Sequence, residues 1–254
     1  MNKTLTILLL LSSVAGAQSE QNLLWNISIT DNAYQVSTGA AWTSETPYAP
    51  KTQWSSQDFT TMPGYVYNDG TKKISFEAAA LGIRFADTFT LSVDCSLTGN
   101  TSAALTSTTC QLLQLCETLT WQFNVTYDTQ AQTIGFGGNT TVNNVQTFGT
   151  YSLADITNVT LTMDGAPNKA GTVTVYLNGE KAASGTMVAA NRHNTSNISA
   201  GLVLLADRVN PDKTGIVGGI SSVSLYNSNI MVPEPTTATL SLLALAGLAA
   251  RRRR

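Results

Sequence analysis

The sequence predicts an all-β fold in which two antiparallel sheets pack face to face as a jelly-roll sandwich. Two segments, Asp87–Leu97 and Thr118–Tyr127, alternate apolar and polar residues along their whole length. This alternation is typical of strands with one face on a core and the other in water. No stretch between the two ends of the chain has a long helical period. Short strands separated by turn residues, without helices between them, favour a sandwich of two sheets.

Shorter apolar runs supply the other expected strands. The dipeptide Asn178-Gly179 should join two of them through a tight hairpin, because both residues tolerate positive φ. Gly135-Phe136-Gly137-Gly138 lacks the context of a phosphate loop and is interpreted as a turn. The expected strands are Leu24–Ile29, Gly64–Tyr67, Lys73–Glu77, Leu81–Phe85, Gln132–Phe136, Val159–Met163, Val173–Leu177, Glu180–Ser184, Gly201–Ala206 and Gly219–Tyr226.

The first seventeen residues have the three parts of a secretory signal peptide. Lys3 provides the positive start, Thr4–Leu11 is apolar, and small residues lead to a cleavage site between Ala17 and Gln18. We therefore expect residues 1–17 to be removed on export and residues 18–230 to form the mature β-sandwich.

The last residues, 231–254, combine three features in a fixed order. Pro233-Glu234-Pro235 is followed by the uncharged run Thr236–Ala250 and then by Arg251–Arg254. As a helix the run would reach only about 22 Å, against roughly 30 Å of hydrocarbon, so it is short for a permanent membrane span. The arginines would stay on the cytoplasmic side. An ordinary tail anchor or a buried basic helix is the alternative.

This tail resembles the PEP-CTERM sorting signal of Gram-negative bacteria, through Pro233, Glu234, Pro235, the apolar run, and the arginine cluster that begins with Arg251 and Arg252. The resemblance implies transient insertion into the membrane, cleavage by an exosortase-type protease, and release or transfer to the cell surface. Proteins with this tail are commonly associated with extracellular polysaccharide and biofilm matrix.

Composition narrows the classes of partner. Only 12% of the residues are charged and the net charge is −2, so the polar surface must be built mainly from Thr, Ser, Asn and Gln. Outside the two ends there is no basic patch, and nucleic acid is therefore excluded as a partner.

Four segments carry a family resemblance: the hairpin Thr172–Gly179 with its return strand from Glu180, the strand Gly201–Ala206, the closing strand Gly218–Tyr226, and the early strand Phe89–Val93. Through them the chain resembles the laminin-G-like domains of the concanavalin A-like lectin/glucanase superfamily. The resemblance implies a curved sandwich whose concave face or rim loops often bind glycans, sometimes with calcium.

Catalytic motifs are missing from the sequence. The glucanases of this superfamily carry Glu-x-Asp-x-x-Glu, and no Glu-x-Asp occurs in this chain. His193 is the only histidine and lies in a polar segment. A catalytic triad needs a histidine held between a nucleophile and an acid, so we do not expect one here. The sequence thus predicts a protein that is not an enzyme, with a divergent glycoside hydrolase as the weaker alternative.

Two sets of residues are candidates for ligand binding. Aromatic residues in a loop-like segment can stack on sugar rings, or can cap the edge of the sandwich as a satellite cluster. Acidic residues in loops can hold calcium, although turns ordinarily use the same residues. The aromatic candidates are Trp42, Tyr48 and Trp54, and the calcium candidates are Asp164, Asp207 and Asp212.

Three cysteines, Cys95, Cys110 and Cys116, permit one disulfide in an oxidising compartment and leave one thiol. A bond between Cys95 and Cys110 would close a loop of about fifteen residues and contribute roughly 3 kcal/mol. The spacing does not decide the pairing.

Together these features predict an exported protein of the cell surface or matrix whose sandwich binds a glycan or another extracellular component. The alternative is a structural matrix protein with no small-ligand site.

Overall fold

The structure is a computed structural model of the 254-residue chain. It describes residues 22–30, 33–38, 60–62, 65–69, 74–76, 87–100, 109–116, 122–166, 168–191, 201–205 and 215–230. The predicted end segments, 1–17 and 231–254, lie outside these residues. In the part of the chain that is described, no helix is long and apolar enough to cross a membrane.

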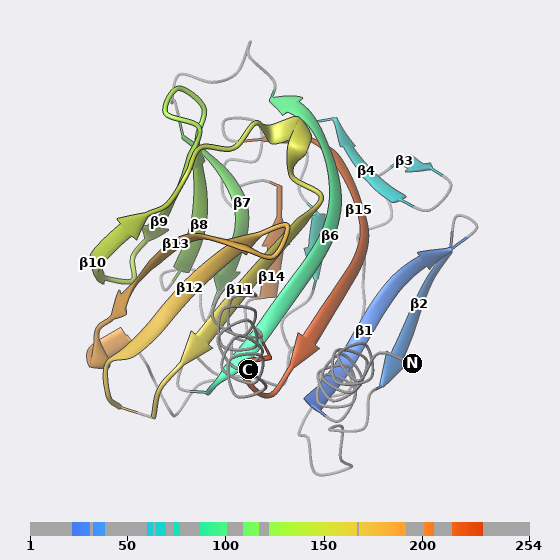
Figure 1. The fold of residues 1–254 in the computed structure, drawn as a ribbon. Coiled ribbons are helices and arrows are strands. Elements are labelled where there is room, and N and C mark those ends of the chain that lie inside the picture. Colours follow the sequence, from blue (N-terminus) through green and yellow to red (C-terminus); the bar gives the residue numbers. More distant parts are fainter. Residues whose placement is uncertain are drawn as a thin grey trace, which may run out of the picture.

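The described elements are almost all strands (Figure 1). They are β1 (Leu23–Thr30), β2 (Ala33–Thr38), β3 (Thr60–Met62), β4 (Tyr65–Asp69), β5 (Ile74–Phe76), β6 (Phe89–Asn100), β7 (Thr109–Cys116), β8 (Gln122–Asp128), β9 (Thr133–Gly138), β10 (Val142–Thr147), the 3-10 turn η2 (Leu153–Asp155), β11 (Asn158–Asp164), β12 (Gly171–Leu177), β13 (Glu180–Met187), the 3-10 turn η3 (Ala189–Asn191), β14 (Gly201–Leu204) and β15 (Ile216–Tyr226).

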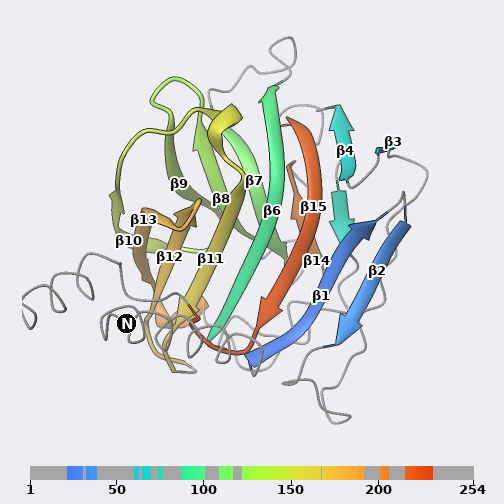
Figure 2. The same cartoon turned by 45° about the vertical axis from the view of Figure 1, so that its right-hand side comes forward.

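The strands form two antiparallel sheets that lie one behind the other (Figure 2). The large sheet has ten strands in the order β10-β13-β12-β11-β6-β15-β1-β2, with β4 paired to β15 and β3 paired to β4. The small sheet has five, in the order β5-β14-β7-β8-β9. The prediction of a two-sheet antiparallel sandwich is confirmed.

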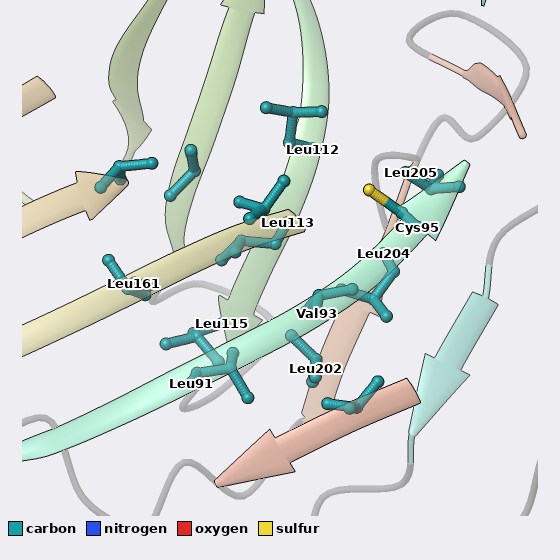
Figure 3. Close-up of a cluster of buried hydrophobic side chains, with 14 of the residues drawn as sticks. Leu91, Val93, Cys95, Leu112, Leu113, Leu115, Leu161, Leu202, Leu204 and Leu205 are labelled. Carbon is teal, nitrogen blue, oxygen red and sulfur yellow. The ribbon is translucent and has the colours of Figure 1, made fainter. Parts of the chain in front are cut away.

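The core lies between the sheets and is built by alternation. On β6 the residues Phe89, Leu91, Val93, Cys95 and Leu97 are all buried, and the exposed Asp94 and Ser96 alternate with the last three. Burial of one such side chain contributes about 1.5–3 kcal/mol. Figure 3 shows leucines of β7 and β14 packed against this row from the small sheet.

The central strand of the small sheet was not predicted. Every residue of β7 after Thr109 is buried, on both faces of the strand. A β-bulge between Gln111 and Leu113 also shifts its register against β8. Burial on both sides and the bulge together remove the alternation that would have revealed this strand.

The predicted hairpin at Asn178-Gly179 is confirmed. Both residues have positive φ, 52° and 85°, and Leu177 pairs with Glu180 across the turn. The Asn178 side chain also accepts hydrogen bonds from the amides of Thr157 and Asn158, at 2.9 and 3.0 Å. This turn therefore fastens the chain that leads from η2 into β11.

Other sequence-based assignments differ from the structure. The Gly135–Gly138 segment is not a turn but the last four residues of β9, paired with β8. Strands β2, β3 and β10 were not expected, and the expected strand Leu81–Phe85 lies outside the described residues. A run of glycines carries no strand propensity of its own, so the pairing with β8 decides its conformation.

The two ends of the described chain meet at one end of the large sheet. Leu23 pairs with Tyr226, and the amide of Asn227 donates to the carbonyl of Asn22 at 3.0 Å. Thr90, buried at the start of β6, donates to the carbonyl of Ser228 at 2.7 Å. The segment after β15 is therefore tied back to the sheet.

Truncating the core residue Leu161 tests this packing. Leu161 is fully buried between the sheets, so Leu161→Ala should lower the free energy of unfolding by about 2–5 kcal/mol. Val145→Ala is the control, because Val145 is 45% exposed on the edge strand β10 and should change stability by less than about 0.5 kcal/mol. Guanidinium unfolding measures both; equal effects would contradict the core described here.

Candidate functional site

A row of carboxamides lies on the face of the small sheet that points away from the core. On β7 and β8 the inward residues are Leu113, Leu115, Phe123 and Val125, which pair across the two strands. Their neighbours therefore point outward. We call this surface the amide face; its residues are Gln111, Gln114, Gln122, Asn124 and Thr126.

The β-bulge brings the two glutamines of β7 to the same face. Residues three apart in a regular strand point to opposite faces. Because the bulge inserts one extra residue, Gln111 and Gln114 both point outward, opposite Thr126 and Asn124 of β8. The amide of Gln114 donates to Gln111 Oε1 at 3.3 Å and to Gln122 Oε1 at 3.1 Å. The bulge thus assembles the hydrogen-bonded row.

These amides are unusually buried for an outer face. Gln114 is fully buried, and Asn124 is 5% exposed. The Oδ1 atom of Asn124 is buried and has no hydrogen-bond partner. Leaving such an acceptor unsatisfied costs about 1–3 kcal/mol. A group that donates a hydrogen bond to Asn124 would recover this cost.

Glycines on β9 leave the amide face without side chains at its edge. Gly135 lies opposite Thr126, and Gly137 lies opposite Asn124. A Cβ at Gly135 would stand 3.2 Å from Thr126 Oγ1, and one at Gly137 would stand 3.3 Å from Thr126 Cγ2. Since β9 is the edge strand of the described small sheet, only backbone lies beside Asn124 on that side.

The end of this strand is held rigidly. Gly138 has φ +95°, and a Cβ there would collide with the carbonyl of Gln122. The same carbonyl accepts from the amides of Asn139 and Thr140, at 2.9 and 3.2 Å. Only glycine fits this position, and the contacts fix β9 against β8.

The outer face of the large sheet carries a second polar group, which is satisfied internally. Asp94 accepts from Asn158 Nδ2 at 2.7 Å and from Ser222 Oγ at 2.5 Å, one bond to each carboxylate oxygen. Asn158 also donates to Ser92 at 2.9 Å and accepts from Thr160 at 2.8 Å. These contacts link β15, β6 and β11, so we assign this network to the stability of the sheet.

The predicted ligand residues are mostly beyond the described part of the chain. Trp42, Tyr48 and Trp54 lie outside it, as do the calcium candidates Asp207 and Asp212. The processing residues Ala17, Gln18, Pro233, Glu234, Pro235, Arg251 and Arg252 lie outside it too.

The one described calcium candidate, Asp164, is exposed at the end of β11. Its Oδ1 atom is 3.5 Å from the hydroxyl of Thr88. Within the described ranges no group of three or more His, Cys, Asp or Glu residues could hold a metal ion. Calcium binding at Asp164 stays a prediction.

The structure does not form the disulfide considered between Cys95 and Cys110. Cys95, Cys110 and Cys116 are all buried, and none of them forms a disulfide. Cys95 belongs to the large sheet, where its thiol lies 3.7 Å from the carbonyl of Ile156, whereas Cys110 belongs to β7 of the small sheet. Burial, with a smaller contribution from the charge of Asp94, raises the pKa of the Cys95 thiol from 9.0 to about 12.

Comparison with known proteins gives only distant likenesses. No protein-family model and no curated protein matches the chain. A Trypanosoma rangeli sialidase in complex with 2,3-difluoro-KDN matches with a TM-score of 0.49 and 19% identity, over 67% of this chain and 26% of that one. The NanB sialidase of Streptococcus pneumoniae matches with a TM-score of 0.40 and 14% identity, over 69% and 27%.

A smaller protein is also similar. The CBM40 of a Ruminococcus gnavus IT-sialidase, bound to α2,6 sialyllactose, matches with a TM-score of 0.34 and 14% identity, over 64% of this chain and 93% of that one. The chain spans about a quarter of the length of the sialidases that it matches.

These likenesses correct one sequence-based prediction, that the chain is not an enzyme. The matched structures include sialidases, which are glycoside hydrolases. As a class, sialidases use a tyrosine nucleophile and not a pair of carboxylates. The missing Glu-x-Asp motif therefore does not separate this chain from glycoside hydrolases.

Sequence reasoning missed the amide face. Gln111 and Gln114 are three residues apart, a spacing that places them on one face only when the bulge is present. The sequence offered one signal, the amides Gln122 and Asn124 that alternate with apolar residues on β8. We expected these two side chains only to face water.

The reactivity of the three thiols tests whether the cysteines are buried in the folded protein. At pH 8 the folded protein should not react with dithiobis(nitrobenzoate), and unfolding should release three reactive thiols, since all three cysteines are buried. Rapid reaction of any thiol in the folded protein would contradict their burial.

The raised pKa of Cys95 also predicts how stability depends on pH. The protonated thiol stabilises the fold, so this contribution is fully present below the unfolded pKa of about 9 and is lost as pH rises towards about 12. Guanidinium midpoints measured across this range should fall less steeply for Cys95→Ala than for the natural chain.

Proposed function

We propose that this chain is an exported, surface-sorted protein with a laminin-G-like jelly-roll domain that binds an extracellular glycan on the amide face. The observation that carries the binding proposal is Asn124, a buried outward-pointing amide whose acceptor has no partner. Unsatisfied buried polar groups in native proteins are rare, and a bound ligand is one reason for them to persist.

The chemistry of the amide face suits a sugar. Each carboxamide offers an acceptor oxygen and two donor hydrogens, and a sugar hydroxyl both donates and accepts. A ligand site typically combines a few well-placed polar groups with apolar surface.

The export half of the proposal rests on the sequence. The signal peptide, residues 1–17, and the PEP-CTERM-like tail, residues 231–254, would send the protein to the surface of a Gram-negative-type bacterium. The structure offers one supporting fact: both ends of the described chain leave from the same end of the large sheet. An exosortase-type protease at the membrane would then meet the tail next to this end.

A structural matrix protein is the second candidate. The observation that favours it is the network around Asp94, which ties three strands of the large sheet together and holds both carboxylate oxygens. A protein of this kind would need a durable sheet and no ligand.

Asn124→Ala separates the two candidates. Under the glycan proposal it should abolish retention on extracellular polysaccharide and should leave the unfolding free energy within about 1 kcal/mol of the natural value, because the unsatisfied acceptor disappears. Asn143→Ala, on the exposed edge strand β10, is the control and should change neither property. Unchanged retention by Asn124→Ala would refute the assignment of the site.

Processing of the tail can be tested in cells that make an exosortase. Mass spectrometry of the mature protein should find a start at Gln18 and an end near Pro233-Glu234-Pro235. Replacing Glu234 and Pro235 by alanine should leave the tail attached and the protein in the membrane fraction. Normal release of this variant would contradict the sorting proposal.

A further inference from the structure

We infer that the amide face selects neutral glycans, whose hydroxyl groups donate hydrogen bonds, over glycans that carry a carboxylate. This inference rests on the proposed function and adds the class of ligand. It comes from three properties of the described residues: which atom is unsatisfied, which donors are already used, and where the nearest charge lies.

The unsatisfied atom at the centre of the face is an acceptor. Asn124 Oδ1 is buried and has no partner, so only a donor can complete it. A sugar hydroxyl can donate, whereas an ionised carboxylate carries acceptors alone. A carboxylate placed here would bring its own acceptor oxygens against Asn124 Oδ1. The Oδ1 atom would still lack a hydrogen bond, and the free-energy cost of burying it would remain.

The central donor of the face is already engaged. A carboxamide nitrogen has two hydrogens, and Gln114 Nε2 donates to both Gln111 and Gln122. An anion would need these donors, since charge-assisted bonds from amide hydrogens are what stabilise a carboxylate. The two donors of Gln114, the most buried residue of the row, are therefore not available to an anion.

The charge next to the face is negative. Asp128 follows Asn124 and Thr126 on the same side of β8, and its carboxylate is held by the amides of Gln130 and Ala131, both at 2.8 Å. The residues described on the amide face include no Lys, Arg or His. A carboxylate on the ligand would be repelled by Asp128 and would meet no cation in this row.

A matched pair of probes tests the inference on the full chain purified in detergent. Immobilised glycans with one neutral core, each with and without a terminal sialic acid or uronic acid, are compared in the same titration. We expect binding to neutral cores and about tenfold weaker binding when the acid is present.

Substitution of Asp128 tests the electrostatic part. Asp128→Asn keeps an acceptor for the turn amides and removes the charge, so it should raise binding of the acidic probes relative to the neutral ones. Asp155→Asn, an exposed acid on η2, is the control and should leave the ratio unchanged.

The outcomes are distinct. Preference for acidic probes, with loss of binding in Asn124→Ala, would overturn the inference and leave the proposed function standing. Failure to bind any probe, neutral or acidic, would overturn both. An unchanged ratio in Asp128→Asn would contradict the role given to that carboxylate.

Discussion

The packing of the inward face of β6 against the inward face of β7 holds this domain together, and the rest of the structure depends on it. Both strands lie at the centre of their sheets, and the side chains between them are almost completely shielded from water. Because each strand sends alternate residues to its two faces, a dry interior requires that the remaining residues point outward. The hydrophobic contact thus decides where every polar side chain of the two sheets lies.

The two outer faces differ in how their polar side chains are hydrogen-bonded. On the large sheet, hydroxyl and amide groups satisfy one another, as in the bond of 2.7 Å between Asn26 and Ser224 and in the network around Asp94. On the small sheet, Asn124 has a buried acceptor without a partner, and its neighbour on β9 is a glycine with no side chain to supply one. A satisfied network stabilises a sheet, whereas a buried acceptor without a partner is stabilised when a donor reaches it. This contrast is why we place the binding site on the small sheet.

The sequence predicted the strands whose two faces differ. On β6 and β8 one face is dry and one is polar, so alternation was visible, and Asn178-Gly179 marked its hairpin because few residues accept positive φ. The strand β7 could not be recognised from the sequence, because it is buried on both faces and contains a β-bulge. The glycine segment of β9 was mistaken for a turn, since only its partner β8 makes it a strand. The amide face depends on both of these features, so the polar residues of β8 alone could not indicate it.

The most direct measurement is an NMR titration of the side-chain amide groups with a neutral glycan that the protein retains. Our account predicts saturable shifts for Asn124 and the glutamines beside it, Gln111, Gln114 and Gln122, with no change for Asn26 and Asn158 on the large sheet. Shifts at Asn26 and Asn158, with Asn124 unaffected, would contradict the central claim that the small sheet carries the binding face.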